Sequence, residues 1–261
     1  MHSLLRAGLG AISSLLLMHP ANAQWQAKAG LGARYVDHAE YDGAGRLLVR
    51  ESGWLPGIAL GAAWTAGNAT LFAAADGYRA GIGYRGQTQS GAAAGSTTGT
   101  TLATLRLGAT YTLARAVSLT AALEADLWKR DIRATRAAAG LQERYRSQRL
   151  LMGAATTWQP AAGTVAADLS VLVARPERLR VGFSGLLDTT TLDTRHGRGL
   201  RLGASLHPAF APTLELRGAY DWIGVQRSAD APVTRNGQFA GTVAQPEHVR
   251  QAVTVTVSRL F

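Results

Sequence analysis

The sequence predicts an all-β fold: a single antiparallel transmembrane β-barrel of about ten strands. Short segments of alternating polarity recur along the chain, and the connections between them are alternately short and long. The chain is 47% hydrophobic, and only 17% of its residues are charged. After Leu17 it contains no apolar run near the roughly 20 residues that a membrane-spanning helix needs. These features favour a membrane barrel over a bundle of membrane helices.

The alternation defines ten segments in which successive side chains point to opposite faces. In chain order they are residues 24–36, 46–64, 69–85, 101–113, 117–130, 144–158, 164–174, 197–207, 213–226 and 247–261. The connections after the even-numbered segments are brief and comprise residues 65–68, 114–116, 159–163 and 208–212. Short turns on one side and long loops on the other are typical of bacterial barrels. An even strand count places both termini of the chain on the short-turn, periplasmic side.

Two irregular segments leave the strand count open. The second segment contains Pro56, and the third loses its alternation near Asp76 and Gly77. A β-bulge would accommodate either irregularity. Eight or twelve strands are the alternatives, if one of these segments is misassigned or if the long connection 175–196 contains a hairpin. The Gly/Ser/Thr/Ala-rich stretch 86–100 is expected to be a loop.

The faces predicted to contact lipid are nearly free of charge. In chain order they carry Leu105, Leu107, Ala109, Tyr111, Leu113, Val117, Leu119, Ala121, Leu123, Ala125, Leu127, Val165, Ala167, Leu169, Val171, Val173, Leu200, Leu202, Ala204 and Leu206. An Arg or Lys at the bilayer midplane would cost about 2–4 kcal/mol. Aromatic residues are expected to ring both ends of this band: Trp25, Trp64, Tyr111, Trp158 and Phe261 at the short-turn end, and Tyr35, Tyr84, Tyr220 and Trp222 at the other.

The last segment resembles the closing strand of a Gram-negative outer-membrane β-barrel. In residues 251–261 (QAVTVTVSRLF), one face carries three valines and Phe261, and the other carries Ala, Thr and Ser. The resemblance implies that Phe261 is an assembly signal read by the barrel assembly machinery. It also implies a single outer-membrane barrel domain over residues 24–261.

The first residues support export. Arg6 precedes an apolar stretch over residues 7–17, and Ala21-Asn22-Ala23 forms an A-x-A cleavage site. We therefore expect residues 1–23 to be a cleaved signal peptide, with an uncleaved N-terminal anchor as the alternative. The chain contains no cysteine, so it offers no thiol for a lipoprotein anchor.

The faces predicted to point into the barrel carry almost balanced charge. They contain Glu51, Glu124, Asp126, Asp168, Glu215 and Asp221, with Lys28, Arg34, Arg106, Arg149, Arg201, Arg217 and Arg250. In a narrow barrel these side chains should meet across the lumen. Residues Arg106, Glu124, Asp126, Asp168, Arg201, Glu215 and Arg217 are therefore predicted to form a lumen charge network. Inward glycines at positions 30, 32, 53, 57 and 61 thin the wall and are compatible with a cleft.

Basic residues also surround the third long loop. The formal net charge is +10, and Lys28 and Lys129 are the only lysines. A basic chain often binds nucleic acid, but export makes anionic lipopolysaccharide the better partner. Arg guanidinium groups bind phosphate through paired hydrogen bonds. The candidate lipopolysaccharide contacts are Lys129, Arg130, Arg133, Arg136, Arg144 and Arg146.

No motif for catalysis, cofactor binding or metal binding is recognisable. The histidines lack metal-ligand spacing, and Gly182-Phe183-Ser184-Gly185 lacks the G-x-S-x-G spacing. Ten strands resemble the omptin proteases, which would imply carboxylates and an Asp–His couple near the extracellular rim. The nearest arrangement is Asp193-Thr194-Arg195-His196 opposite Glu124 and Asp126. Its spacing departs from the omptin pattern, so no catalytic role is assigned.

The sequence thus predicts a non-catalytic outer-membrane barrel with a charge-paired lumen, which has a structural role or contacts surface ligands such as lipopolysaccharide. A small-solute or ion channel is the first alternative. A hydrolase at the rim, supported by strand count alone, is the second.

Overall fold

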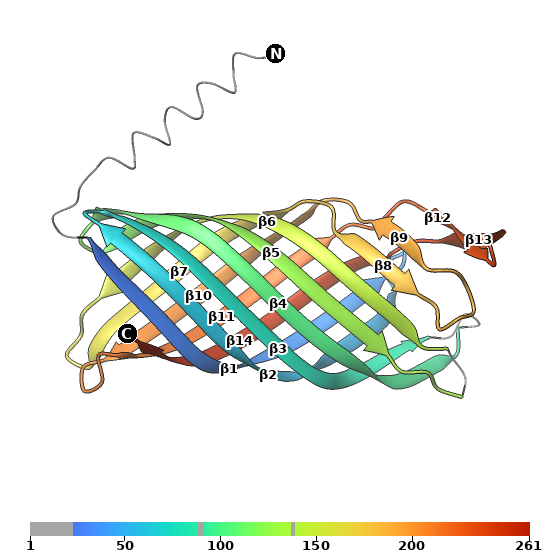
Figure 1. Cartoon of the computed structure of the whole chain (residues 1–261), viewed down its shortest axis with the longest axis horizontal. Helices are drawn as coiled ribbons and strands as arrows, with labels where there is room; N and C mark the ends of the chain where they lie inside the picture. The colour runs from blue at the N-terminus through green and yellow to red at the C-terminus, as the bar shows by residue number, and fades with distance from the viewer. Residues whose placement is uncertain (1–22, 88–90, 137–138) are drawn as a thin grey trace, which may run out of the picture.

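Ten long antiparallel strands close into one barrel (Figure 1). The computed structural model describes residues 23–87, 91–136 and 139–261, so most of the predicted signal peptide lies outside the described residues. The barrel strands are β1 (Gln24–Tyr41), β2 (Leu47–Ala66), β3 (Ala69–Gln87), β4 (Ala93–Ala114), β5 (Val117–Ile132), β6 (Leu141–Trp158), β7 (Gly163–Ala174), β10 (Gly197–Pro208), β11 (Leu214–Val225) and β14 (Glu247–Leu260). Neighbours along the chain pair with each other, and β1 closes the ring by pairing with β14. The predicted fold class and strand count are confirmed.

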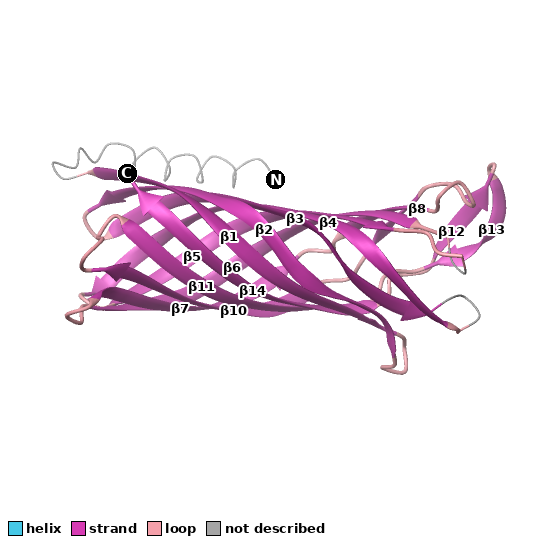
Figure 2. Ribbon diagram, turned by 90° about the horizontal axis from the view of Figure 1, so that it is seen from below, coloured by secondary structure: helices cyan, strands magenta, loops and turns pink. Residues whose placement is uncertain are grey.

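Two hairpins extend one end of the barrel (Figure 2). The first, β8 (Arg178–Gly182) and β9 (Thr190–Asp193), lies in the long connection after β7. We call the end of the barrel with the short turns the lower end and the end with the long loops the upper end. The hairpin adds no barrel strand, because β8 pairs with the upper part of β6 and β7 pairs with the lower part. The second, β12 (Ala231–Arg235) and β13 (Gln238–Val243), forms a separate two-stranded sheet. Among the described residues there is no helix long and apolar enough to cross a membrane.

The irregularities predicted in the second and third segments produce no β-bulge. Ser52 pairs with Gly83 and Gly57 with Tyr78, so the register is the same on both sides of Pro56. Asp76 pairs in continuous register with Thr104. The expected bulges were therefore wrong. Pro56 faces outward and lies opposite Ala33 of β1, and Asp76 faces the lumen.

The predicted loop 86–100 was also wrong over most of its length. β4 begins at Ala93 and pairs with β3 as far as Gln87. Its inward side chains Thr98 and Thr100 are buried, and small residues alternate with them. This part of the hairpin rises above the lipid-facing band, where the outer face need not be apolar.

A band of exposed apolar side chains surrounds the lower part of the barrel. It includes Leu31, Leu107, Leu123, Val171 and Leu202. At the short-turn end, exposed Trp25, Tyr111, Trp158 and Phe261 border the band, and at the other end the rings of Tyr35 and Trp54 lie 5.4 Å apart. Tyr84, predicted among the outer aromatic residues, instead alternates with outward residues on β3 and lies inside the barrel.

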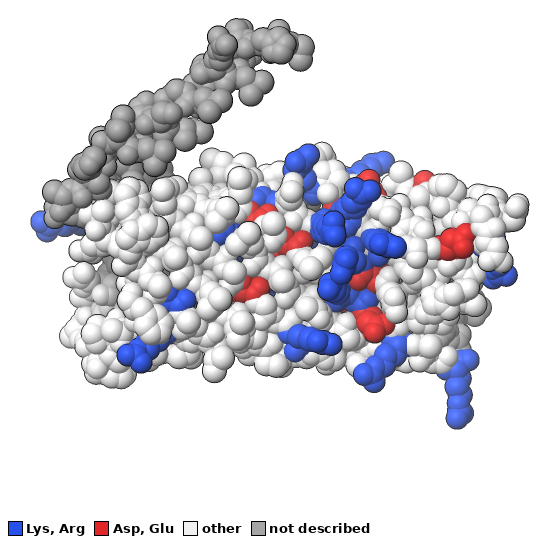
Figure 3. Space-filling view, viewed as in Figure 1, with Lys and Arg blue, Asp and Glu red and all other residues white. Residues whose placement is uncertain are grey.

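Charged side chains mark the upper edge of the apolar band. We call this level the outer collar; its outward-facing residues are Asp37, Arg50, Arg79, Lys129, Arg144, Arg146, Arg175 and Arg198. Asp37 and Arg50 form an ion pair of 2.6 Å on the outer wall. Figure 3 shows basic side chains gathered at this level on one face of the molecule. Because charge is costly against lipid, the barrel above the collar lies outside the membrane.

Candidate functional site

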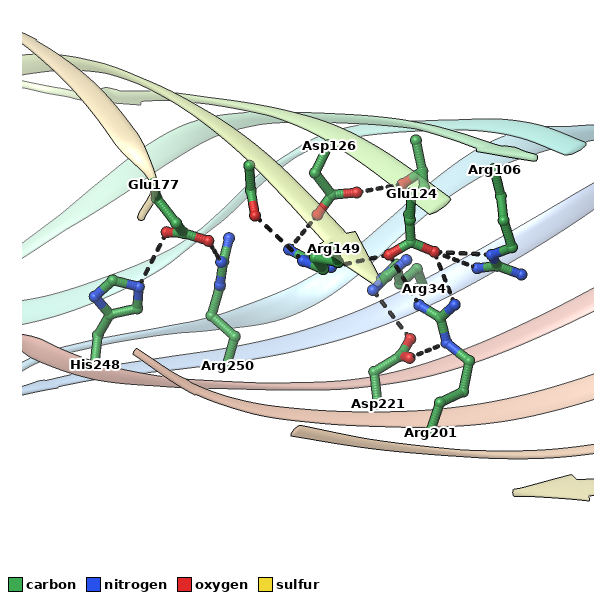
Figure 4. Close-up of polar contacts among 12 residues, drawn as sticks. Arg34, Arg106, Glu124, Asp126, Arg149, Glu177, Arg201, Asp221, His248 and Arg250 are labelled. Carbon is green, nitrogen blue, oxygen red and sulfur yellow. Dashed lines mark hydrogen bonds and ion pairs between the residues drawn. The ribbon is translucent and has the colours of Figure 1, made fainter. Parts of the chain in front are cut away.

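The lumen is crossed at mid-height by a cluster of ion pairs centred on Glu124 (Figure 4). Its carboxylate, on β5, is 2% exposed. Arg106 of β4 donates to it at 2.6 and 2.9 Å, Arg149 of β6 at 3.1 Å, and Arg201 of β10 at 2.8 and 3.3 Å. Three guanidinium groups from three strands therefore converge on one buried carboxylate.

The same layer continues to the remaining walls. Arg201 also pairs with Asp221 of β11, which accepts from Arg34 of β1 at 3.2 Å. Arg149 pairs with Asp126, which accepts from Thr104 at 2.9 Å. We call Arg34, Arg106, Glu124, Asp126, Arg149, Arg201 and Asp221 the middle layer. Its side chains come from β1, β4, β5, β6, β10 and β11, so they meet across the barrel section.

Below the middle layer, the lumen opens toward the short-turn end. Lys28 pairs with Glu215 at 2.6 Å, and Arg217 with Asp168 at 2.7 Å. A cavity of about 350 Å³ lies among these pairs and has Arg106 and Arg201 in its lining. The cavity therefore reaches the middle layer from below.

Above the middle layer, a second cluster surrounds Arg130. This guanidinium, 2% exposed, donates to Glu51 and Glu40 at 3.0 Å each and to Glu143 at 2.6 Å. The Tyr145 hydroxyl lies 3.0 Å from it and donates to Glu143. One cation thus forms ion pairs with three buried carboxylates, at a level above the outer collar.

Aromatic rings and two histidines fill the rest of this upper layer. Trp128 stacks on Tyr145 with ring centroids 5.0 Å apart, and the Arg130 and Arg250 guanidinium groups each lie 5.1 Å from the Trp128 ring. His38 and His248 are fully buried, with ring centroids 5.2 Å apart. We define the upper layer as His38, Glu40, Glu51, Trp128, Arg130, Glu143, Tyr145, Glu177, His248 and Arg250.

Burial shapes the charge of the upper layer. It lowers the pKa of His38 to about 4, because the cation is deprived of water. Burial likewise raises the pKa of Glu143 to about 7; the negative charges of Glu40 and Glu51 act in the same direction, and the Arg130 charge opposes them. Burial also opposes ionisation of Glu40, but the Arg130 charge and the His38 hydrogen bond hold the pKa of Glu40 well below its usual value.

Two histidine–glutamate contacts lie in the upper layer. His38 Nε2 lies 2.9 Å from Glu40, and His248 Nε2 lies 3.3 Å from Glu177. All four side chains are buried beneath the extracellular end. The described residues contain no cluster of three or more His, Cys, Asp or Glu that could hold a metal ion.

The predicted lumen residues all lie inside the barrel. Arg106, Glu124, Asp126 and Arg201 belong to the middle layer, whereas Asp168, Glu215 and Arg217 form the pairs below it. Sequence reasoning missed His38, Glu40, Trp128, Glu143, Tyr145, Glu177 and His248 of the upper layer.

Larger side chains pack against three of the inward glycines, and one of the three, Gly61, also lines the cavity below the middle layer. A Cβ on Gly57 would lie 2.3 Å from the Tyr78 ring, and one on Gly53 would lie 2.7 Å from Ile82. These larger side chains occupy the space that the glycines provide. Gly61 similarly accommodates the Lys28 stem at 3.0 Å.

The residues predicted to contact lipopolysaccharide divide into three groups. Lys129, Arg144 and Arg146 face outward, and Arg133 and Arg136 lie exposed after β5. Arg130 lies inside, so its assignment to the outer surface was wrong. It shares the inward face of β5 with Glu124, Asp126 and Trp128, because strand residues alternate.

The rim arrangement considered for hydrolysis is not assembled. Asp193 and His196 are exposed, whereas Glu124 is buried in the middle layer. Asp193 lies opposite Arg178 in the β8–β9 hairpin. The two sets of residues lie on different sides of the barrel wall.

Comparison with known proteins identifies the fold. No family model matches the chain, and no curated protein matches it. Among solved structures, the outer-membrane protease OmpT from Escherichia coli aligns with a TM-score of 0.58 and 10% identity, over 93% of this chain and 96% of that one. The translocator domain of the autotransporter NalP from Neisseria meningitidis aligns at 0.49 and 12% identity, over 99% and 95%. The chain therefore has the fold of a Gram-negative outer-membrane β-barrel.

Proposed function

We propose that this protein is a non-conducting, non-catalytic outer-membrane barrel that acts through its outer wall and extracellular end. The observation that carries the proposal is the middle layer, in which Glu124 joins Arg106, Arg149 and Arg201 across the lumen. A continuous water path would require these pairs to separate. Separation would leave buried charges without partners, which is unfavourable, so the closed arrangement is favoured.

A small-solute channel is the second candidate function. It is supported by the cavity of about 350 Å³ that reaches Arg106 and Arg201 from the short-turn end. In a channel, the middle layer would be a gate, and its charges would select the permeating solute. A rim hydrolase has less support, because Asp193 and His196 are separated from the lumen carboxylates.

Planar-bilayer recording distinguishes the closed barrel from the channel. We expect the wild-type protein to give no stable conductance over a range of voltages, because three ion-paired arginines and Glu124 fill the lumen. An ion-selective conductance that changes in Arg106→Ala or Glu124→Ala would instead establish a channel. A known porin recorded in the same bilayer controls for successful insertion.

We also propose that export through a cleaved signal peptide brings the chain to the barrel assembly machinery, with Phe261 as part of the assembly signal. Phe261 is 69% exposed, and its backbone pairs with Ala27 at 2.9 and 3.3 Å. The side chain therefore remains accessible beside the β1–β14 seam.

Replacing Phe261 by Asp should reduce the amount of folded protein in the outer membrane several-fold and leave unassembled chain in the periplasm. Heat-modifiable migration on gels measures the folded fraction. Phe239→Asp is the matched control, because Phe239 is also exposed, at 71%, but lies in the distant β13 hairpin. Normal insertion of the Phe261 variant would show that Phe261 is not needed for assembly.

A further inference from the structure

Five cations form a grid on the outer wall of the barrel. Lys129 of β5 lies directly opposite Arg144 of β6, and Arg144 lies directly opposite Arg180 of β8. In the adjacent row, Arg146 lies opposite Arg178. We call Lys129, Arg144, Arg146, Arg178 and Arg180 the cation grid. All five side chains are exposed.

Acidic groups do not neutralise this grid. Asp193 lies opposite Arg178 on its other side, and Asp131 follows Lys129 on β5. Nevertheless, none of the five cations forms an ion pair with a carboxylate in the part of the chain that the structure describes. Like charges at directly opposed strand positions are destabilising. Two such rows side by side therefore favour the binding of an anion that is not part of the chain.

The grid adjoins the apolar band. Arg146 lies directly opposite Leu127, the last apolar residue of the lipid-facing side of β5. A groove of about 980 Å³ joins the two surfaces: Leu105, Ala125 and Leu127 line it together with Arg144, Arg146 and Arg178. Two acidic residues also border it: Asp76, and Asp126, which is paired with Arg149. The alanines at positions 75, 103 and 125 contribute its smaller side chains. One groove thus offers both apolar and cationic contacts at the height of the outer collar.

We propose that the cation grid and its groove bind the phosphorylated, acylated sugar of the outer leaflet, the lipid A part of lipopolysaccharide. Guanidinium groups donate paired hydrogen bonds to phosphate oxygens, and the apolar part of the groove accommodates an acyl chain. The site replaces the predicted set around the third loop: it keeps Lys129, Arg144 and Arg146, adds Arg178 and Arg180, and excludes the buried Arg130. It rests on the proposed orientation, in which the long loops face the cell exterior.

The test compares two double variants of the full barrel in detergent. Arg144→Gln/Arg180→Gln removes two charges from the grid, and Arg79→Gln/Arg198→Gln removes two isolated charges from the same collar. Each protein is titrated with bisphosphorylated lipid A, with dephosphorylated lipid A and with inorganic phosphate. Native mass spectrometry reads out the binding.

We expect the grid variant to bind bisphosphorylated lipid A about tenfold or more weakly than the wild type, and the collar variant to bind within about twofold of it. Without lipid, the grid variant should unfold at the same or a higher temperature than the wild type, because the opposed cations no longer repel each other. A variant that had simply misfolded would unfold at a lower temperature.

Three outcomes would overturn the site. They are equal binding by the wild type and the grid variant, equal losses in both double variants, and binding of dephosphorylated lipid A as tight as that of the bisphosphorylated form. Tight binding of inorganic phosphate alone would show that the site binds a soluble anion rather than the lipid. Because bilayer conductance is measured separately, failure of the closed-barrel proposal would not be confused with failure of this site.

Discussion

Replacing Glu124 by Ala is expected to lower the free energy of unfolding by about 3–5 kcal/mol, because it leaves buried cations without their shared carboxylate. Arg149 retains Asp126 and Arg201 retains Asp221 as ion-pair partners. Arg106, by contrast, loses the carboxylate to which it donates at 2.6 and 2.9 Å. The loss should therefore be shared between Arg106, whose side chain is 25% exposed, and the more deeply buried Arg149 and Arg201.

Urea unfolding in lipid vesicles, followed by tryptophan fluorescence, measures the effect. Asp168→Ala is the matched control, because its pair with Arg217 is 24–29% exposed and should contribute no more than about 1 kcal/mol. The double variant Glu124→Ala/Arg106→Ala should recover part of the loss, since it also removes the orphaned cation. Equal losses in the Glu124 and Asp168 variants would show that the middle layer does not hold the lumen closed.

Most of the barrel could be predicted from sequence because lipid enforces alternation on its outer wall. Within the lipid-facing band, the polarity pattern identified all ten strands and the inward position of every middle-layer residue. The pattern weakens above the outer collar, where both faces of a strand are polar or small. There the predicted strands ended at residues 36 and 130 or began at 101 and 144, whereas the actual strands extend farther.

Three members of the upper layer were missed for the same reason. His38 and Glu40 continue the inward face of β1 after Val36, and Glu143 precedes the predicted start of β6. Extending the first segment by four residues, and starting the sixth one residue earlier, would have included them. Arg130 was grouped with the surface arginines by charge, although it has the same parity as Glu124. Glu177 was beyond prediction, because it enters the barrel from a connection between strands.

Replacing Arg130 by Met should also destabilise the protein by about 3–5 kcal/mol at pH 8. The substitution keeps an unbranched side chain in contact with Trp128 and Tyr145 but removes the cation that Glu40, Glu51 and Glu143 share. Three buried carboxylates would then repel each other above the outer collar. Protonation of a carboxylate would remove its charge and so reduce this repulsion.

The loss should therefore depend on pH with a definite sign. Burial already raises the pKa of Glu143 from its ordinary value of 4.5 to about 7, and without Arg130 this pKa loses the nearby positive charge that opposes the rise. The folded state then binds more protons than the unfolded state above about pH 4.5, so its stability falls as pH rises. We expect the deficit relative to the wild type to be smaller at pH 5 than at pH 8 by about 1–3 kcal/mol.

Comparing variant with wild type at each pH cancels the titrating groups that lie away from Arg130. His38 does not cancel, because the Arg130 charge is one of the causes that lower its pKa. His38 contributes in the opposite sense, because its pKa is lowered from 6.5 to about 4 and stability therefore rises with pH over that interval. Arg130→Lys, which keeps a cation, should show a smaller deficit with little pH dependence. Arg130→Met/Glu143→Gln should regain part of the stability at pH 8, since one repelling carboxylate is gone. A deficit independent of pH would mean that Arg130 stabilises the upper layer by packing against Trp128 rather than by its charge.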